Sequence, residues 1–260
     1  MLFEYDATTN RIFEMPPYFF FTVIGIVVSS SLFILLLLKY RHNIPRYTKI
    51  FFMSGGGLLI GAKLFGGLSG LYIALANKKP ITLEIFLNTG IVFLGGLIGF
   101  VLTFLLMCKV SNKKIDFGVV DLAVVCIPLF HFWARFGCFF AGCCYGIEAD
   151  SKLSVRYTTL IHGEIITASR IPVQLFEAGL NIAIFGVLLI LLAKNKCKNH
   201  FLEIYLLVYS SMRIGLELFR GDDIRGIWNG ISFSQFTSII IICVLIFTIK
   251  SSKEKKHENT

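Results

Sequence analysis

Long apolar runs separated by short polar stretches dominate the chain. Runs of this length with few charges are typical of helices that cross the roughly 30 Å hydrocarbon core of a bilayer. The pattern therefore predicts an all-α polytopic membrane protein with seven transmembrane helices, forming a single membrane domain over residues 1–260. The predicted spans cover residues 18–38, 50–76, 86–108, 118–144, 171–193, 201–219 and 230–249.

The polar stretches between the spans are short. The longest, residues 146–170, contains SVRYTTLIHGEII, whose alternation predicts a small β-hairpin on the outer side. The basic tail at 250–260 is expected to be a disordered cytoplasmic cap. The first residues, MLFEYDATTNRIFE, are acidic and polar, so we expect no cleavable signal peptide.

Composition agrees with a membrane protein. The chain is 55% hydrophobic and 16% charged, and its mean hydropathy is +0.75. Its formal charge of +9 comes largely from Lys and Arg after the first, third, fifth and last spans. The positive-inside rule then puts the amino terminus outside and the carboxyl terminus in the cytoplasm. This charge favours contact with anionic membrane lipids and gives no reason to expect nucleic acid.

Several charged residues lie inside the apolar runs. Arg213, Glu217 and Arg220 have spacings of four and three, which place them on one face of a helix. Lys63, Arg135 and Glu177 lie inside other spans, and Lys63, Arg135, Arg213 and Glu177 fall in the outer third of the bilayer. A charge in hydrocarbon is costly unless it is paired or lines a cavity. A purely structural ion pair and independent snorkelling are the alternatives to one polar cavity that binds a lipid phosphate.

The segment ARFGCFFAGCCYG, residues 134–146, combines small residues with cysteines. Gly137, Gly142 and Gly146 permit close backbone approach or a broken helix, and ordinary helix packing is the alternative. Three of the seven cysteines fall here. They either pack as small apolar side chains or form a disulfide such as Cys138 with Cys143 or Cys144. No metal site is expected, because only His131 has a suitable spacing.

The chain resembles the prolipoprotein diacylglyceryl transferases, bacterial inner-membrane enzymes with seven spans. ARFGCFFAGCCYG is similar to the family's GRxGNFxNGExxG, and IPVQLFE, residues 171–177, to HPxQLYE. LGGLIG, residues 94–99, is similar to HGGLIG, and GAKLFG, residues 61–66, to GxRLG. The last of these motifs, RxxxExFR, is matched by Arg213, Glu217 and Arg220.

The resemblance implies transfer of a diacylglyceryl group from phosphatidylglycerol to the lipobox cysteine of a prolipoprotein signal peptide, in the bacterial cell membrane. It implies that Arg135 and Arg213 hold the donor phosphate, that Glu217 orients Arg213, and that Glu177 and Tyr18 handle protons. No cofactor is expected, because arginines can stabilise the leaving phosphate. The implied substrate-binding positions are Lys63, Gly95, Gly96, Gly137, Cys138, Gly142, Cys143, Gly146, Gln174 and Arg220.

This chain departs from the family motifs at polar positions. Cys138, Ala141 and Cys143 replace two asparagines and a glutamate, and Leu94 and Ile171 replace histidines. Three alternatives follow: a related transferase with another thiol, hydroxyl or glycan acceptor; a non-catalytic phospholipid-binding protein; and a thiol–disulfide oxidoreductase. The last is disfavoured, because such enzymes favour a CxxC pair.

Overall fold

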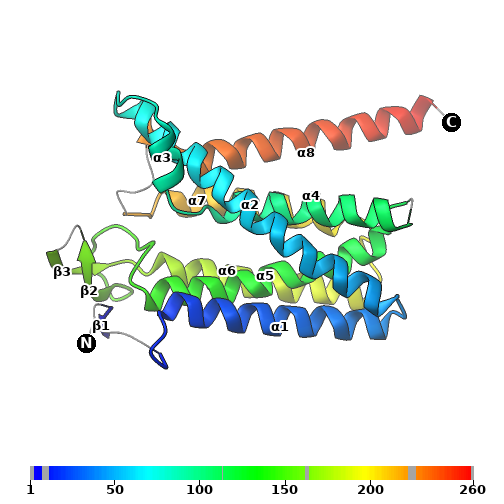
Figure 1. Ribbon diagram of the computed structural model, residues 1–260, viewed down its shortest axis with the longest axis horizontal. Helices are drawn as coiled ribbons and strands as arrows, with labels where there is room; N and C mark the ends of the chain where they lie inside the picture. The colour runs from blue at the N-terminus through cyan, green and yellow to red at the C-terminus, as the bar shows by residue number, and fades with distance from the viewer. Residues whose placement is uncertain (1–2, 8–11, 113, 162–163, 222–226, 259–260) are drawn as a thin grey trace. The chain divides into compact units, whose positions relative to one another are not determined.

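The computed structural model (Figure 1) describes residues 3–7, 12–112, 114–161, 164–221 and 227–258. The chain divides into two compact units, each made of segments from distant parts of the sequence. Unit 1 comprises Met1–His42, Asp121–Phe201 and Leu218–Asp223, and unit 2 comprises Asn43–Val120, Leu202–Glu217 and Ile224–Thr260.

Three long helices form the body of unit 1: α1 (Pro17–Lys39), α5 (Phe117–Phe140) and α6 (Val173–Ala193). They run side by side in Figure 1. Pro17 is compatible with the start of α1, where its missing N–H would have no intrahelical partner. Aromatic rings hold α1 to α5, and the Phe21 and Phe140 rings stack with centroids 5.0 Å apart. A Cβ added at Gly25 would lie 3.0 Å from Cβ of Trp133, so a glycine is needed for this close approach.

A three-stranded sheet lies at one end of these helices. It contains β1 (Phe3–Asp6), β2 (Val155–Ile161) and β3 (Glu164–Arg170), in the order β1-β2-β3. β1 pairs with β2 in parallel, and β2 pairs with β3 antiparallel. The predicted hairpin is therefore confirmed, although its tip lies outside the described residues. Strand β1, which extends the hairpin to a three-stranded sheet, was not predicted.

Unit 2 contains α2 (Ile44–Ala76), α3 (Leu83–Asn88), α4 (Phe93–Asn112), most of α7 (Phe201–Glu217) and α8 (Phe233–Glu258). A short hairpin of β4 (Ile227–Trp228) and β5 (Ile231–Ser232) precedes α8. α2 and α4 pack through glycines: a Cβ on Gly61 would meet the carbonyl oxygen of Gly95, and one on Gly99 would meet that of Gly57. Small residues let the two backbones approach closely.

The predicted spans agree broadly with the helices, but several bounds differ. The span predicted at 118–144 is too long, because α5 ends at Phe140, and the one at 230–249 begins within the β4–β5 hairpin. Six of the described helices are long and apolar enough to cross a membrane, whereas α7 has 17 residues, about 25 Å at helical rise. The predicted span at 86–108 is interrupted, because α3 ends at Asn88 and α4 begins at Phe93. α8 continues to Glu258, so a helix occupies most of the segment assigned to a disordered tail. The single membrane domain stays a prediction.

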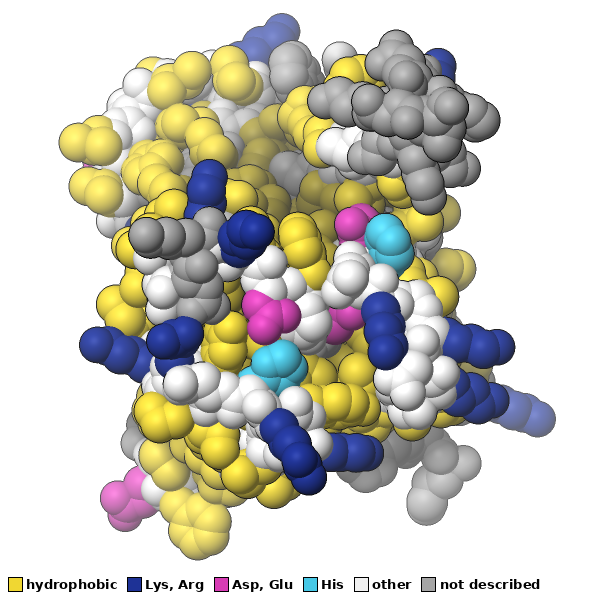
Figure 2. All heavy atoms as spheres, turned by 90° about the vertical axis from the view of Figure 1, so that its right-hand side faces the viewer, with side chains coloured by type: hydrophobic (Ala, Val, Ile, Leu, Met, Phe, Trp, Pro, Cys, Tyr) yellow, Lys and Arg dark blue, Asp and Glu magenta, His cyan; other side chains and the backbone are white. Residues whose placement is uncertain are grey.

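The surface also fits a membrane protein. Large apolar side chains are exposed along the long helices, including Leu59 and Ile60 of α2 and Phe247 of α8. Basic residues occupy the last turns of α1 and α4, at Lys39 and Lys109. Lys and Arg side chains project from the face drawn in Figure 2, beside hydrophobic ones. The protein is therefore a multi-pass membrane protein with polar helix ends.

Candidate active site

A buried charged cluster joins α5 to α6 in unit 1. The Nη2 atom of Arg135 lies 3.0 Å from Oε1 of Glu177, and the two side chains are only 9% and 2% exposed. One turn earlier on α5, His131 accepts a hydrogen bond of 3.1 Å from Nε of Arg135 at its own Nε2. The same Nε2 atom lies 3.5 Å from Oε1 of Glu177, so His131, Arg135 and Glu177 form one buried cluster. Sequence reasoning missed this contact, although the spacing of four between His131 and Arg135 was visible.

Such an ion pair, away from water, has a clear electrostatic consequence. Removing two charges from water is costly, and the cost is offset only by close pairing with further hydrogen bonds. The guanidinium group of Arg135 has a close ionic partner in Glu177 and a further hydrogen-bond acceptor in His131. The predicted catalytic pair Arg135 and Glu177 is thus brought together, and Glu177 holds Arg135 in one orientation.

The chain makes a tight turn immediately after α5. The Gly142 N–H donates to the carbonyl oxygen of Phe139, and Gly142 has a φ of +66°. That left-handed conformation favours glycine. The Cys143 N–H then donates to the Cys138 carbonyl oxygen at 3.1 Å. Cys144 also has a positive φ, of 59°. The turn therefore folds the chain back over the end of α5.

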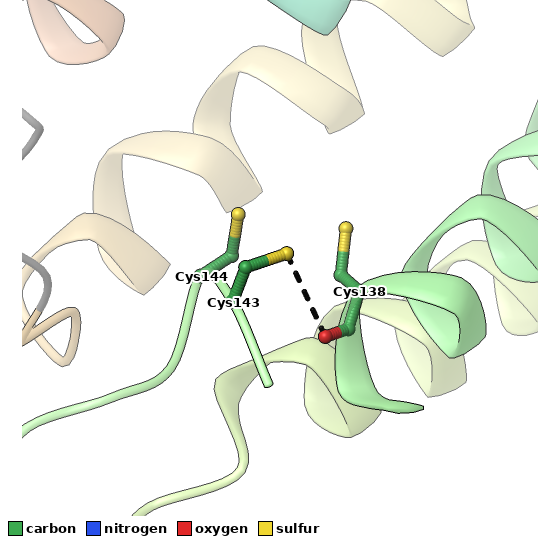
Figure 3. Close-up of side chains that lie close together, drawn as sticks. All are labelled: Cys138, Cys143 and Cys144. Carbon is green, nitrogen blue, oxygen red and sulfur yellow. Dashed lines mark hydrogen bonds between the residues drawn. The ribbon is translucent and has the colours of Figure 1, made fainter. Parts of the chain in front are cut away.

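The turn brings three cysteines together (Figure 3). The sulfur atoms of Cys138, Cys143 and Cys144 all lie within 4.8 Å of one another, and all three residues are free thiols. The predicted disulfide alternative is therefore not what the structure has. The Cys143 thiol donates a hydrogen bond of 3.7 Å to the Cys138 carbonyl oxygen, which holds these two side chains close together.

Gln174 at the start of α6 fixes the turn from the other side. Its Nε2 donates a 2.7 Å hydrogen bond to the carbonyl oxygen of Cys143, and its side chain is fully buried. The predicted site residues Gln174 and Cys143 are thus in direct contact. This bond ties the IPVQLFE segment to the cysteine segment.

A Gln174→Met variant is expected to be about 1–3 kcal/mol less stable than the wild type, because the buried Cys143 carbonyl loses its donor. Chemical denaturation in detergent micelles measures the change. An Asn77→Leu variant is the matched control, because it removes an amide–carbonyl bond of 3.0 Å at the exposed end of α2. We expect that variant to differ from the wild type by less than about 0.5 kcal/mol. Equal losses of stability in both variants would contradict a stabilising role for the hydrogen bond from Gln174 to Cys143.

Gly146 and Arg220 meet through the backbone in unit 1. Residues 145–147 lie between two other segments: the Ile147 N–H donates to the carbonyl oxygen of Phe219, and the Gly146 N–H to that of Ile171, both at 2.9 Å. A Cβ on Gly146 would lie 2.5 Å from that Ile171 oxygen, so only glycine fits. Arg220 is 8% exposed. The ARFGCFFAGCCYG segment and the segment that matches RxxxExFR therefore meet here.

A further buried arginine, Arg170 at the end of β3, was not predicted. Its Nη2 lies 2.7 Å from Oε1 of Glu148, and its guanidinium carbon is 4.3 Å from the centre of the Tyr145 ring. A cation over an aromatic face is attracted by the ring quadrupole. Because Arg170 directly precedes IPVQLFE, its position next to a motif was the available signal.

Tyr18 and Gly137 mark a close approach of α1 to α5. A Cβ on Gly137 would lie 3.2 Å from Cα of Tyr18. Tyr18 is 38% exposed, so its side chain remains accessible. Tyr18 is therefore a neighbour of the ARFGCFFAGCCYG segment. Its role in proton transfer stays a prediction.

Unit 2 contains the other predicted catalytic arginine. On α7, Nη2 of Arg213 lies 3.1 Å from Oε2 of Glu217, one turn later. The hydroxyl of Ser234, at the start of α8, donates a 2.7 Å hydrogen bond to the same Glu217 oxygen. Glu217 is 3% exposed. This ion pair is the contact through which Glu217 was predicted to orient Arg213. Ser234 is a further partner of Glu217 that was not predicted.

Lys63 and the glycines of α4 have structural contacts in unit 2. The Lys63 ammonium donates to the carbonyl oxygens of Leu87 and Thr89 at 2.6 and 2.7 Å, at the end of α3. A positive group at a helix carboxyl end is favourable. Cβ atoms on Gly95 and Gly96 would meet Phe65 and Leu58 of α2. Helix packing accounts for these glycines, and substrate binding by all three residues stays a prediction.

Arg135 and Arg213 belong to different units, so a shared phosphate pocket stays a prediction. Within its own unit, each arginine is buried against a glutamate on apolar helices. These features define a multi-pass membrane protein with buried arginine–carboxylate pairs, a class in which such charges carry function.

Comparison with known proteins identifies the family. A family model described as "Prolipoprotein diacylglyceryl transferase" matches residues 8–250. The chain belongs to this family and is a transferase of its type. The resemblance stated from the motifs is therefore confirmed.

Curated relatives carry the corresponding name. The chain is 31% identical over 174 residues to "Phosphatidylglycerol--prolipoprotein diacylglyceryl transferase 2" of Clostridium perfringens, covering 65% of this chain and 66% of the relative. It is 30% identical over 202 residues to the Clostridium tetani transferase, covering 74% and 79%. The Helicobacter hepaticus transferase is 34% identical over 176 residues, covering 65% and 58%. The matches thus span roughly three-fifths to four-fifths of each relative.

Proposed function

We propose that the protein transfers the diacylglyceryl group of phosphatidylglycerol to the lipobox cysteine thiol of a prolipoprotein. The family match and the relatives named for this reaction support the proposal. The observation that carries it is the Arg135–Glu177 pair, because a buried guanidinium held at a fixed position suits a phosphate ester in an apolar environment.

The chemistry is a displacement at carbon. The substrate sulfur forms a bond to the terminal glycerol carbon of the diacylglyceryl group as the bond from that carbon to the phosphate oxygen breaks. Glycerol phosphate leaves with the electron pair, and the thiol proton passes to a base. Arg135 and Arg213 stabilise the charge that develops on the phosphate. Glu177 and Glu217 orient these arginines, and proton transfer falls to Glu177 or Tyr18.

The proposed setting is a bacterial cytoplasmic membrane. We assign seven spans, with α7 as the sixth in chain order, the amino terminus outside and the carboxyl terminus in the cytoplasm. Basic last turns at Lys39 and Lys109 support this orientation. In this orientation the segment that contains Gly142, Cys143 and Gly146 lies toward the outer side and contacts the substrate. We assign further substrate contacts to Lys63, Gly95, Gly96 and Arg220.

The proposal is tested by incorporation of labelled lipid from phosphatidylglycerol into a lipobox peptide, using purified protein in mixed micelles. We expect transfer from phosphatidylglycerol and none to a peptide whose lipobox cysteine is replaced by serine. Bound lipid without any turnover would instead indicate a non-catalytic phospholipid-binding protein.

An Arg213→Ala variant is expected to transfer lipid at least about tenfold more slowly, a loss of about 1.4 kcal/mol of transition-state stabilisation. Arg213→Lys keeps the charge but loses the planar fork, and it should recover only part of the rate. The same assay measures both. Full activity of Arg213→Ala in a folded sample would rule out a role for this arginine in phosphate binding.

One observation favours a second candidate. Cys138 is buried and Cys143 lies in the adjoining turn, at positions where the family motif has asparagine and glutamate. Loss of those polar groups supports a related transferase with a different acceptor. Turnover of phosphatidylglycerol with no product on any lipobox peptide would favour this function.

A further inference from the structure

The three sulfur atoms at the end of α5 form a cluster that takes no part in the bond changes of the proposed transfer. Cys138 is on the last turn of α5, and Cys143 and Cys144 follow in the turn. Figure 3 shows the three side chains gathered around one small region, and their sulfur atoms are within 4.8 Å of one another. Each cysteine therefore offers one ligand atom to the same point.

Hydrogen bonds and the backbone conformation hold the three cysteines in this arrangement. Both the N–H and the thiol of Cys143 are directed at the Cys138 carbonyl oxygen, at 3.1 and 3.7 Å. Gln174 holds the Cys143 carbonyl from α6. The positive φ at Gly142 and Cys144 completes the turn. The three sulfur atoms are thus preorganised, which reduces the entropy lost on binding a ligand.

Positive charge accompanies the sulfur atoms. Nη1 of Arg135 lies 4.0 Å from Sγ of Cys138. Arg220 forms a backbone bridge with Gly146, two residues after Cys144. Since a metal binds thiolates rather than thiols, nearby guanidinium groups lower the cost of collecting negative charge in this region.

We propose that Cys138, Cys143 and Cys144 bind one thiophilic metal ion, of the Cu(I) or Zn(II) class, through three sulfur ligands. Three sulfurs at the usual metal–sulfur distance of about 2.3 Å are about 4 Å apart, which the cluster accommodates with small side-chain movements. Soft thiolates select Cu(I) and Zn(II) over Mg(II) or Ca(II). Any thiol still protonated loses its proton to water when the ion binds.

The inference goes beyond the proposed function and does not depend on it, because its readout is bound metal. The full chain is purified in detergent, reduced, and titrated anaerobically with Cu(I) and with Zn(II) against chromophoric competitors. We expect one equivalent of one of these ions per chain. Serine replacement of Cys138, Cys143 and Cys144 together should weaken binding by at least about a hundredfold.

The matched control is Cys197→Ser with Cys243→Ser, which removes two exposed cysteines outside the cluster and should leave affinity unchanged. X-ray absorption at the edge of the bound metal, on the unmodified protein, should find three sulfur neighbours, so the test holds even when the triple variant does not fold. No competitive binding of either ion, fewer than three sulfur neighbours, or unchanged affinity in the triple variant would overturn the proposal.

Discussion

Replacement of Arg135 by alanine is expected to lower the rate of lipid transfer by about 10²–10³-fold, the loss typical for removing one donor that stabilises a developing anion. The guanidinium is buried and held by Glu177 and His131, so it need not reorganise when charge appears on the phosphate. The lipid-incorporation assay measures this loss. An Arg135→Lys variant keeps the charge without the bidentate geometry. Its transfer rate should therefore lie between those of the wild type and Arg135→Ala.

Loss of Arg135 also affects folding, so the rate must be compared in folded samples. The Glu177 carboxylate would remain buried without this partner, which costs about 3–5 kcal/mol in comparable pairs. Circular dichroism and denaturation in micelles report this loss, and the double variant Arg135→Ala, Glu177→Ala should recover part of the stability but none of the activity.

The chain offers a matched control in Arg156→Ala. Arg156 pairs with Glu4 at 3.1 Å, but the two side chains are 57% and 69% exposed. An exposed pair contributes about 0–1 kcal/mol, so both stability and transfer should stay near the wild-type values. A folded Arg135→Ala protein as active as Arg156→Ala would refute the phosphate-binding role.

A Gly61→Ala variant is expected to lose about 1–3 kcal/mol of stability or to fail to fold. The added Cβ would meet the Gly95 carbonyl oxygen of α4 and the Cα of Gly99. These are backbone atoms, so no side-chain rotation relieves the overlap and the two helices must separate. Denaturation in detergent micelles, with the yield of folded protein, measures the change.

Gly56→Ala is the control for this variant and should change stability in the opposite direction. It lies five residues earlier on α2, where an added Cβ has nothing within 4 Å. Alanine is the better helix former by about 0.8–1.0 kcal/mol, so Gly56→Ala should be neutral or stabilising. If both variants lost stability equally, glycine flexibility rather than close packing would explain the motif.

The helices were predictable because hydrophobic runs of membrane length carry a strong signal. The predicted spans at 18–38 and 171–193 differ from α1 and α6 by no more than two residues at either end. The interruption between α3 and α4 was not predicted, although Asn88, Thr89 and Gly90 interrupt the apolar run at that point. It depends on tertiary contacts, such as the Val92 N–H donating to the Ala62 carbonyl oxygen, which sequence periodicity does not contain.

The residues of the candidate site were proposed from the sequence, but their contacts could not be predicted from it. Intramembrane charge drew attention to Arg135 and Glu177, and the family motifs to Gln174 and Cys143. The pairing of Arg170 with Glu148 was not visible, because it depends on how β3 meets the segment after the turn. The clustering of three thiols requires the positive φ at Gly142 and Cys144, and non-glycine residues rarely reveal such a conformation in advance.

The pairing of residues 145–147 with residues 219–221 has a consequence for biosynthesis. Unit 1 is closed by a segment that the ribosome makes only after α7, so the nascent chain has no partner for the Ile147 N–H until Phe219 has emerged. Domains usually fold from the amino terminus as they are synthesised. Here residues 145–147, which follow the cysteine turn, are completed late, and a chain arrested before α7 would leave the translocation machinery with that segment unpaired.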